Sequence, residues 1–256
     1  MIASLGMYDR AETAAANDRY WALIRDNLRQ RGVAAPESLT RGDAAFWTAW
    51  EAPDLVLSQT CGFPYRARLH DHVTLIGTPD FGLPDCPPGY YNSVFVSRAN
   101  DARAGLGDFR EARFAYNDDL SHSGWAAPQN HARTLGFFFH PSVKTGGHRL
   151  SALAVAEGRA DLMAMDALTY ALCLRYDPAM ADLREIGRTA PTPGLPYIAA
   201  TGADKASAFD AVGDAIAALT PQDCEVLSLR GLVRIEPSTY LAVPTPPSPD
   251  QIARSL

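Results

Sequence analysis

Apolar residues along the chain occur in two kinds of grouping. Short runs bounded by polar or turn-forming residues are typical of buried strands, and the first of them is Ile2–Met7. Longer stretches carry apolar residues at helical spacing, as in Glu12–Arg31 with Tyr20, Ile24 and Leu28 on one face. The pattern therefore predicts a strand at the start of the chain, followed by an amphipathic helix.

The same two groupings alternate through the rest of the sequence. Further strands are predicted at Asp54–Ser58, Val73–Gly77, Ser93–Arg98, Arg113–Tyr116, Phe137–His140, Asp161–Met165, Ile186–Thr189, Tyr197–Ala200 and Gly231–Ile235. Further helices are predicted at Ala44–Trp50, Trp125–Thr134, Arg149–Glu157, Asp166–Leu174 and Lys205–Leu219. Because strands and helices alternate, we expect an α/β protein built on mostly parallel sheets flanked by helices.

Two segments rich in proline, glycine and aromatic residues interrupt this alternation. They are Pro88–Tyr91 and Pro193–Tyr197, and they bracket the middle of the 256-residue chain. Segments of this composition are usually turns. They are also compatible with a middle lobe that is inserted into a second lobe and joined to it by two extended crossings.

Composition excludes several classes of protein. The formal net charge of -6 argues against a nucleic-acid-binding protein, which needs a basic surface. No apolar stretch is long enough for a membrane span, so we expect no membrane insertion. The four cysteines contain no CxxC pair, and we expect neither a metal site nor a cofactor: Cys61, Cys86, Cys173 and Cys224.

The strongest local signal lies between Phe114 and Trp125. A predicted strand ends there in a loop with Asn117, Ser121, His122, Ser123 and Gly124, and a helix follows. The carboxyl end of a strand that meets a helix N-terminus favours an anion, because free amides and hydroxyl donors converge there. A serine that merely caps the helix explains the same pattern.

Three further segments carry candidate ligand-binding residues. His148 follows two glycines at the start of a predicted helix, and Asp166 ends a predicted strand, where it could bind a ligand or orient His148. Cys61 and Gly62 come directly after another strand, and Tyr8 follows the first strand. Each of these residues has an ordinary structural explanation as well, in capping or packing.

Taken in order, these segments resemble a known family. The quoted residues are Tyr8, Ala115–Asn117 with Ser121–Gly124, Gly146–His148, and Ala156–Asp161 with Asp166. They resemble the phosphate/phosphite/phosphonate family of ABC-transporter substrate-binding proteins, which have the type 2 periplasmic-binding fold. The resemblance implies that Ser121, Ser123 and the Gly124 amide hold phosphoryl oxygens. It also implies that His148, Asp166 and Tyr8 face the ligand.

The resemblance implies a domain organisation as well. One lobe would comprise residues 1–89 and 197–256, and the inserted lobe residues 90–196. Tyr90–Val94 and Leu195–Ile198 would be the two hinge strands, about which the lobes close on a ligand bound between them. Position 122 departs from the family, because His122 stands where the family usually has a small hydroxyl residue.

Two functions follow as expectations. The first is a solute-binding protein for a small anion, either phosphate- or phosphonate-like or a carboxylate, with an ABC permease or a regulatory protein as partner. The alternative is a cytosolic enzyme on the same fold that uses His122, His148 and Asp166 as acid and base. The cysteine-rich iron motif of the related thiamine-pathway enzymes is missing.

The N-terminus determines where the protein would act. Met1–Arg10 lacks the basic region, the long apolar region and the cleavage site of a signal peptide. We therefore expect a cytoplasmic protein if Met1 is the natural start, and a periplasmic one if the chain has been trimmed from a longer precursor.

Overall fold

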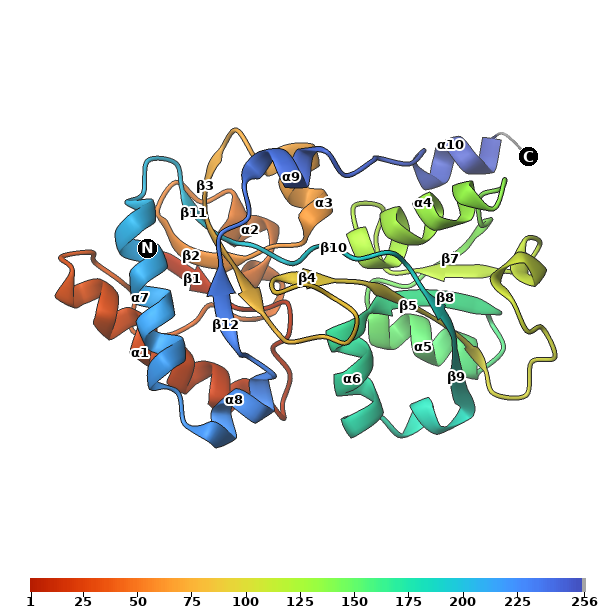
Figure 1. Ribbon diagram of the computed structural model, residues 1–256, viewed down its shortest axis with the longest axis horizontal. Helices are drawn as coiled ribbons and strands as arrows, with labels where there is room; N and C mark the ends of the chain where they lie inside the picture. Colours follow the sequence, from red (N-terminus) through yellow and green to blue (C-terminus); the bar gives the residue numbers. More distant parts are fainter. Residues whose placement is uncertain (255–256) are drawn as a thin grey trace. The chain divides into compact units, whose positions relative to one another are not determined.

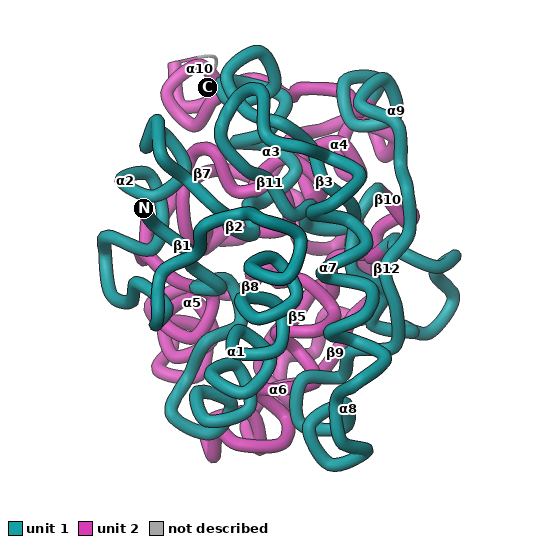
Figure 2. Tube along the Cα trace, turned by 90° about the vertical axis from the view of Figure 1, so that its left-hand side faces the viewer, with its two compact units in different colours: residues 1–90, 193–242 teal, residues 91–192, 243–256 magenta. Residues whose placement is uncertain are grey.

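The computed structural model describes residues 1–254, which form two compact units (Figures 1 and 2). Unit 1 contains residues 1–90 and 193–242, coloured teal in Figure 2. Unit 2 contains residues 91–192 and 243–254, coloured magenta. No helix among residues 1–254 is both long enough and apolar enough to cross a membrane.

Unit 1 is built on a five-stranded mixed sheet. Its strand order is β1 (Ile2–Ser4), β2 (Leu55–Gln59), β11 (Tyr197–Ala200), β3 (Val73–Asp80) and β12 (Gly231–Val233). β1 and β2 are parallel, whereas β11 lies antiparallel between β2 and β3, and β12 is antiparallel to β3. Strands β1, β2 and β3 therefore end at the same edge, which places the residues after β1 and β2 close to one another.

Two apolar clusters hold the helices of unit 1 on this sheet. The long helices are α1 (Ala14–Gln30) and α7 (Lys205–Ala218), followed by α8 (Pro221–Leu227). Tyr20, Ile24 and Leu28 of α1 are buried with Val212 of α7 in one cluster. The short helices are α2 (Trp47–Trp50), α3 (Gly62–Pro64) and α9 (Pro237–Leu241). The second cluster contains Trp50 of α2, Tyr240 of α9 and Ile198 of the sheet, together with Tyr65 of the short π-helix Tyr65–Leu69 that follows α3.

Unit 2 has its own five-stranded mixed sheet. Its strand order is β7 (Pro141–Lys144), β6 (Phe114–Tyr116), β8 (Leu162–Asp166), β5 (Ser93–Arg98) and β9 (Leu183–Arg188). β6 is parallel to β7 and β8, and β5 is antiparallel to β8 and β9. Consequently β6 and β8 end at the same edge, where the start of β5 also lies.

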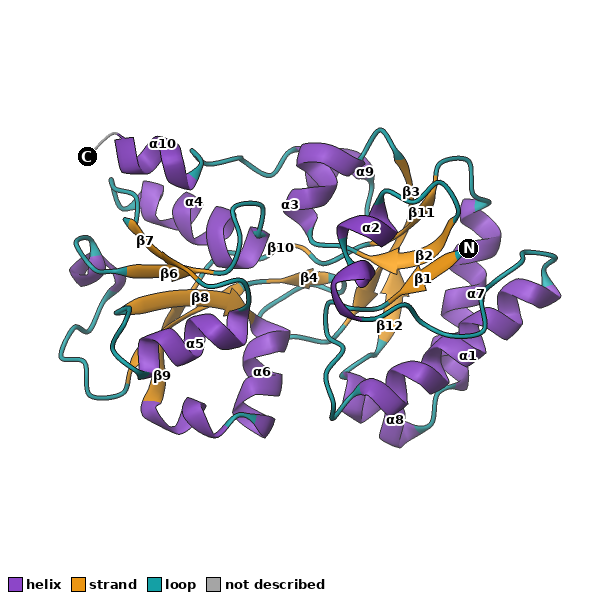
Figure 3. Ribbon diagram, turned by 180° about the vertical axis from the view of Figure 1, so that it is seen from behind, coloured by secondary structure: helices purple, strands orange, loops and turns teal. Residues whose placement is uncertain are grey.

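Helices cover both faces of the unit 2 sheet (Figure 3). Helices α5 (His148–Ala156) and α6 (Ala167–Tyr176) lie on one face, and α4 (Ala127–Thr134) and α10 (Pro249–Arg254) on the other. Phe95, Phe114 and Phe139 are fully buried between the sheet and α4. This packing fixes the ends of β6 and β8 that carry the candidate site.

The chain passes between the units at three places. The first two are β4 (Tyr90–Tyr91) and β10 (Thr192–Pro193), which pair as a two-stranded sheet. The third follows Ala242. The second crossing thus precedes the expected hinge strand Leu195–Ile198, since Tyr197 and Ile198 belong to β11 of the unit 1 sheet.

The C-terminal segment differs from the expected domain organisation. We expected residues 197–256 in a single lobe, but residues 243–254 belong to unit 2. Two hydrogen bonds explain this placement. The Trp125 indole donates to the Pro247 carbonyl at 3.2 Å, and the Asn130 side chain donates to the Pro244 carbonyl at 2.7 Å.

The predicted α/β class is confirmed, but the expectation of mostly parallel sheets is wrong, because each sheet combines parallel and antiparallel pairs. β5 and β11 are antiparallel to both of their neighbours. Each is the first strand of a five-stranded sheet after a crossing between the units, β5 after the first crossing and β11 after the second. The predicted strand Phe137–His140 is wrong, because the strand begins at Pro141. The amide and carbonyl of Phe139 are instead bound by the Gln129 side chain, each at 2.9 Å.

Candidate functional site

The segment between β6 and α4 turns into a short π-helix, His122–Ala126. Ser121 is its N-cap residue, and the Ser121 hydroxyl accepts a hydrogen bond from the Gly124 amide at 3.0 Å. The capping interpretation of Ser121 is therefore confirmed. In this structure the Gly124 amide, which we expected to hold ligand oxygens, donates to Ser121.

Three candidate residues from separate parts of the sequence meet beside this π-helix. Ser123 Oγ lies 2.9 Å from His148 Nε2, and the same nitrogen lies 3.7 Å from Asp166 Oδ2. His148 begins α5, while Asp166 ends β8 and caps α6 by accepting the Thr169 amide at 2.8 Å. Parallel β6 and β8 bring their carboxyl ends together and thereby assemble this group.

The group is buried, and burial governs the charge of His148. The side chain of His148 is 14% exposed and that of Asp166 is 5% exposed. Burial lowers the pKa of His148 below its usual value, and the Asp166 carboxylate and the Ala164 backbone carbonyl oppose this effect only in part. The imidazole is thus expected to be neutral at neutral pH, with one N–H donor and one acceptor nitrogen.

This pKa gives a direct prediction for the ligand-free protein. His148 is expected to titrate below the ordinary value of 6.5, and Asp166→Asn should lower its pKa further because it removes the carboxylate that favours the protonated ring. Two-dimensional NMR of the imidazole carbons as a function of pH measures both values. A midpoint above 6.5 in the ligand-free wild type would show that Asp166 outweighs burial. Because the unfolded chain then takes up the proton more readily, His148 should reduce stability as the pH falls below about 6.5.

Asn117 and Gly124 are in close contact at the edge of this group. A Cβ atom on Gly124 would overlap the Asn117 side-chain oxygen and lie 3.1 Å from His148 Cε1. The Asn117 side-chain oxygen is buried and has no hydrogen-bond partner among the described residues. The Asn117 carbonyl accepts the Gly146 amide at 3.0 Å, which ties the loop before α5 to the end of β6.

His122 lies in the same segment but contacts different residues. Its side chain is buried, its Nε2 lies 3.0 Å from Thr192 Oγ1, and its ring lies 5.8 Å from that of Tyr91. Both contacts are with residues at the crossings between the units. The structure therefore places the His122 side chain against β4 and β10.

A polar group that was not predicted from the sequence lies at the start of β5. Asn92, Ser93 and Thr189 are buried, and Ser93 lies opposite Asp166 in the register of β5 and β8. Within residues 1–254, the Asn92 side-chain oxygen and Ser93 Oγ are buried without a hydrogen-bond partner. Two polar residues directly before the apolar run of β5 were the available signal.

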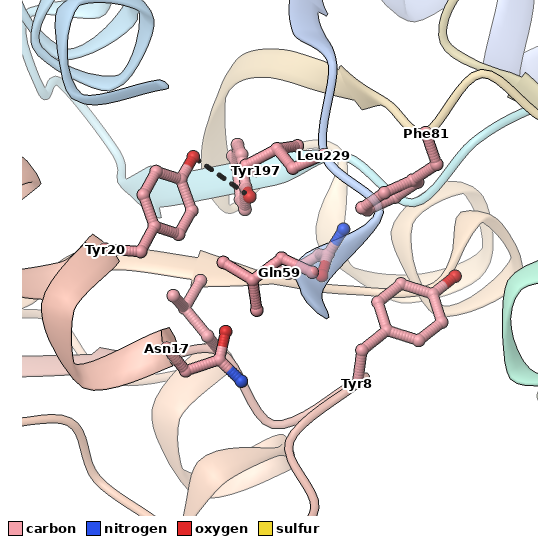
Figure 4. Close-up of a pocket in the computed structure, with 9 residues that line it drawn as sticks. Tyr8, Asn17, Tyr20, Gln59, Phe81, Tyr197 and Leu229 are labelled. Atoms are coloured by element: carbon pink, nitrogen blue, oxygen red, sulfur yellow. Dashed lines mark hydrogen bonds between the residues drawn. The ribbon is translucent and has the colours of Figure 1, made fainter. Parts of the chain in front are cut away.

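In unit 1, Tyr8 lines a small pocket (Figure 4). Tyr8 packs edge-on against Phe81 with ring centroids 5.3 Å apart, and Tyr20 and Tyr197 share a hydroxyl–hydroxyl hydrogen bond of 3.3 Å on the other side. Gln59 lies between these pairs. The pocket has a volume of about 20 Å³, which is room for about one water molecule.

Cys61 and Gly62 lie elsewhere in unit 1. Cys61 is the N-cap residue of α3, and it is buried. A Cβ atom on Gly62 would approach the Tyr240 ring at 3.8 Å and the Pro193 carbonyl at 3.9 Å. Neither residue lines the Tyr8 pocket, so the structure does not bring these three candidates together. Residues 1–254 contain no group of three or more His, Cys, Asp or Glu side chains placed to hold a metal ion.

Several solved structures share the fold of this chain. PhnD1 from Prochlorococcus marinus in complex with methylphosphonate has a TM-score of 0.72 and 17% identity, covering 99% of this chain and 97% of that one. A binding-protein component of an ABC phosphonate transporter from Pseudomonas aeruginosa has a TM-score of 0.67 and 14% identity, covering 94% and 82%. MatC from Rhodopseudomonas palustris with bound malate has a TM-score of 0.60 and 14% identity, covering 100% and 94%. These identities establish the fold alone.

A family model matches residues 49–240 of the chain. Its description is "ABC transporter, phosphonate, periplasmic substrate-binding protein". The chain belongs to this family of phosphonate substrate-binding proteins. No curated protein sequence matches the chain closely. The expected solute-binding role is confirmed, and the comparisons give no support to the alternative of an enzyme. Members of this family bind a small ligand and work with an ABC permease.

Proposed function

We propose that this chain binds a small phosphonate- or phosphate-like anion through Ser121, Ser123 and His148 of unit 2. The observation that carries the proposal is the 2.9 Å contact of Ser123 with His148 at the start of the π-helix. It joins a hydroxyl, an imidazole and a helix N-terminus at one place. Each of these groups can donate a hydrogen bond to a tetrahedral oxyanion.

The electrostatics of unit 2 suit a ligand with more than one polar group. The first amides of the π-helix and of α5 have no intrahelical acceptor and carry partial positive charge, which favours an anion. Asp166 and the buried side-chain oxygens of Asn92 and Asn117 are hydrogen-bond acceptors. A protonated phosphoryl oxygen is a donor that these acceptors can bind, whereas a simple carboxylate offers none at neutral pH.

The proposal extends to a role in transport. Family membership supports delivery of the ligand to an ABC permease, with the protein acting in the periplasm. Closure of the two units on the ligand stays a prediction, as does the contribution of Tyr8, Cys61 and Gly62 to binding.

Isothermal titration with methylphosphonate, inorganic phosphate and malate tests the proposal. Methylphosphonate or phosphate should bind more tightly than malate, and Ser123→Ala should weaken binding about 10- to 100-fold, because a hydrogen bond to a charged ligand contributes about 1.5–3 kcal/mol. Ser142→Ala is the matched control, since Ser142 is exposed on β7 and bonds only the His140 carbonyl among the described contacts.

Three outcomes would contradict the proposal. Absence of binding for all three anions would refute the anion site itself. Equal affinity of the wild type and Ser123→Ala would remove the contact on which the assignment rests. Tighter binding of malate than of either phosphorus anion would change the ligand class to a carboxylate.

A further inference from the structure

His122 connects the proposed anion-binding segment to both strands at which the chain enters and leaves unit 2. Its Nε2 lies 3.0 Å from the hydroxyl of Thr192, the residue at which the central part of unit 2 ends. Its ring lies 5.8 Å from the ring of Tyr91, the residue at which that part begins, at an interplanar angle of 50°. Because Tyr91 belongs to β4 and Thr192 to β10, a single side chain contacts both paired strands.

The His122 contact lies at the start of the π-helix His122–Ala126, whose backbone conformation needs support from its surroundings. π-Helices are rare and occur mostly as single turns, frequently at functional sites. Sparsely populated backbone conformations persist where surrounding contacts hold them. Every residue from Ser121 to Ser123 makes a side-chain contact that fixes the π-helix: Ser121 with the Gly124 amide, His122 with Thr192, and Ser123 with His148. Of these three contacts, only that of His122 reaches the crossing strands.

His122 is a buried side chain of unit 2 rather than a solvent-exposed one. His122 and Tyr91 are each 2% exposed. A buried imidazole must satisfy its polar atoms within the protein, and the Thr192 hydroxyl does this for Nε2. A serine or threonine at position 122 is too short to span the same distance.

We propose that His122 is a positioning residue that couples the anion-binding segment Ser121–Gly124 to the crossing strands β4 and β10. The proposal rests on the proposed anion site and adds a connection that the site residues themselves do not make. A change of backbone conformation at β4 and β10 moves the His122 side chain and, through it, the amides of the π-helix. In the other direction, a ligand that orders the π-helix also orders the crossings.

The test combines ligand binding with amide hydrogen exchange. Thr192→Val removes the hydroxyl partner with little change of shape, His122→Leu removes the imidazole, and His122→Gln keeps a polar group at a similar reach. Thr192→Val and His122→Leu should weaken methylphosphonate binding about 10-fold and speed exchange of the amides of residues 121–126 by a similar factor, as expected for loss of one hydrogen bond. His122→Gln should restore both properties to within about threefold of the wild type.

Thr74→Val is the matched control. Thr74 is a partly buried threonine of unit 1 whose hydroxyl donates to the Ala200 carbonyl at 3.0 Å. Its replacement should affect neither methylphosphonate binding nor exchange in residues 121–126. The control therefore separates the specific connection from a general effect of removing a threonine hydroxyl.

The failure of this inference and that of the proposed function are distinguishable. If the wild type binds no methylphosphonate, the proposed function fails, and hydrogen exchange in Thr192→Val still decides whether the connection exists. Unchanged exchange of residues 121–126 in Thr192→Val would overturn the inference even if His122→Leu does not fold. Lost binding in His122→Leu with unchanged exchange would also overturn it, because His122 would then contact the ligand directly.

Discussion

Gly124→Ala is expected to weaken anion binding by at least about 100-fold, the largest effect of any single methyl group in unit 2. The new Cβ would overlap the Asn117 side-chain oxygen and lie 3.1 Å from His148 Cε1. Neither neighbour can move freely, because the Asn117 oxygen is buried and the His148 side chain is 14% exposed. The substitution must therefore displace Asn117, His148 or the π-helix.

Isothermal titration with methylphosphonate measures the loss, and thermal unfolding reports whether the fold survives. Gly107→Ala is the matched control, because a Cβ at Gly107 meets nothing within 4 Å and lies in unit 2 as well. Asn117→Ala in the Gly124→Ala background removes the overlapping oxygen. It should recover most of the lost stability if the overlap is the cause.

The result also discriminates between two interpretations of the segment. If the glycine serves only the helix cap, Gly124→Ala should affect stability and leave the affinity of the folded protein unchanged. If the segment is the anion site, affinity falls even in preparations that unfold at the wild-type temperature. Wild-type affinity for methylphosphonate in Gly124→Ala would refute the anion site.

The elements that were predicted well from sequence are those with a strong local pattern. The helix predicted at Glu12–Arg31 is α1, Ala14–Gln30, and the strand predicted at Ser93–Arg98 has the same bounds in the structure. Both depend on periodicity within a single segment. The strand predicted at Phe137–His140 failed because the side chain of Gln129, in the preceding helix α4, binds the Phe139 backbone, and periodicity within the segment itself does not reveal this contact.

The candidate site shows the same division between local and long-range information. Ser121 at a helix start could be recognised from its neighbours, and it is a helix cap in the structure. The contact between Ser123 and His148 requires β6 and the loop before α5 to end at one edge of the sheet, which no local pattern encodes. Asn92 and Ser93 were missed because the direction of β5 depends on the crossing that precedes it.

Asp161→Asn is expected to destabilise unit 2 by about 2 kcal/mol, because it removes one partner of a largely buried group of ion pairs. The Asp161 carboxylate accepts hydrogen bonds from the side chains of Arg98 and Arg113, each with at least one bond of 3.0 Å or less, and from the Arg113 amide at 3.0 Å. Its side chain is 14% exposed. An asparagine cannot accept from all of these donors, and it removes the charge that balances them.

Arg98 explains why the loss should spread beyond one ion pair. Its guanidinium also donates to the carbonyls of Val155 at 3.1 Å and Ala160 at 2.7 Å, which lie at the end of α5 and just after it. Without Asp161, Arg98 loses its orientation and these carbonyls lose their donor. Chemical denaturation followed by tryptophan fluorescence measures the free energy of unfolding, with Trp125 as the reporter in unit 2.

Asp161 and the nearby Asp101, which both contact Arg103, predict how the stability of unit 2 changes in acid. Hydrogen bonds from Arg103 lower the pKa of Asp101 from 3.8 to about 2, and those from Arg113 and Arg98 lower the pKa of Asp161 well below its usual value. Because both folded-state pKa values lie below the unfolded ones, the stabilisation is complete above about pH 5. It is lost as the pH falls toward 2. Asp161→Asn should therefore differ from the wild type at neutral pH and approach it in acid.

Glu157→Gln provides the control for this charge effect. Glu157 pairs with Arg159 at 2.8 Å in the same unit, but both side chains are about half exposed, so removing the charge should change stability by less than about 0.5 kcal/mol. A loss of equal size in both variants would show that net charge, rather than the buried arrangement around Asp161, determines the stability of unit 2. A loss confined to Asp161→Asn that disappears in acid identifies the buried carboxylate as the cause.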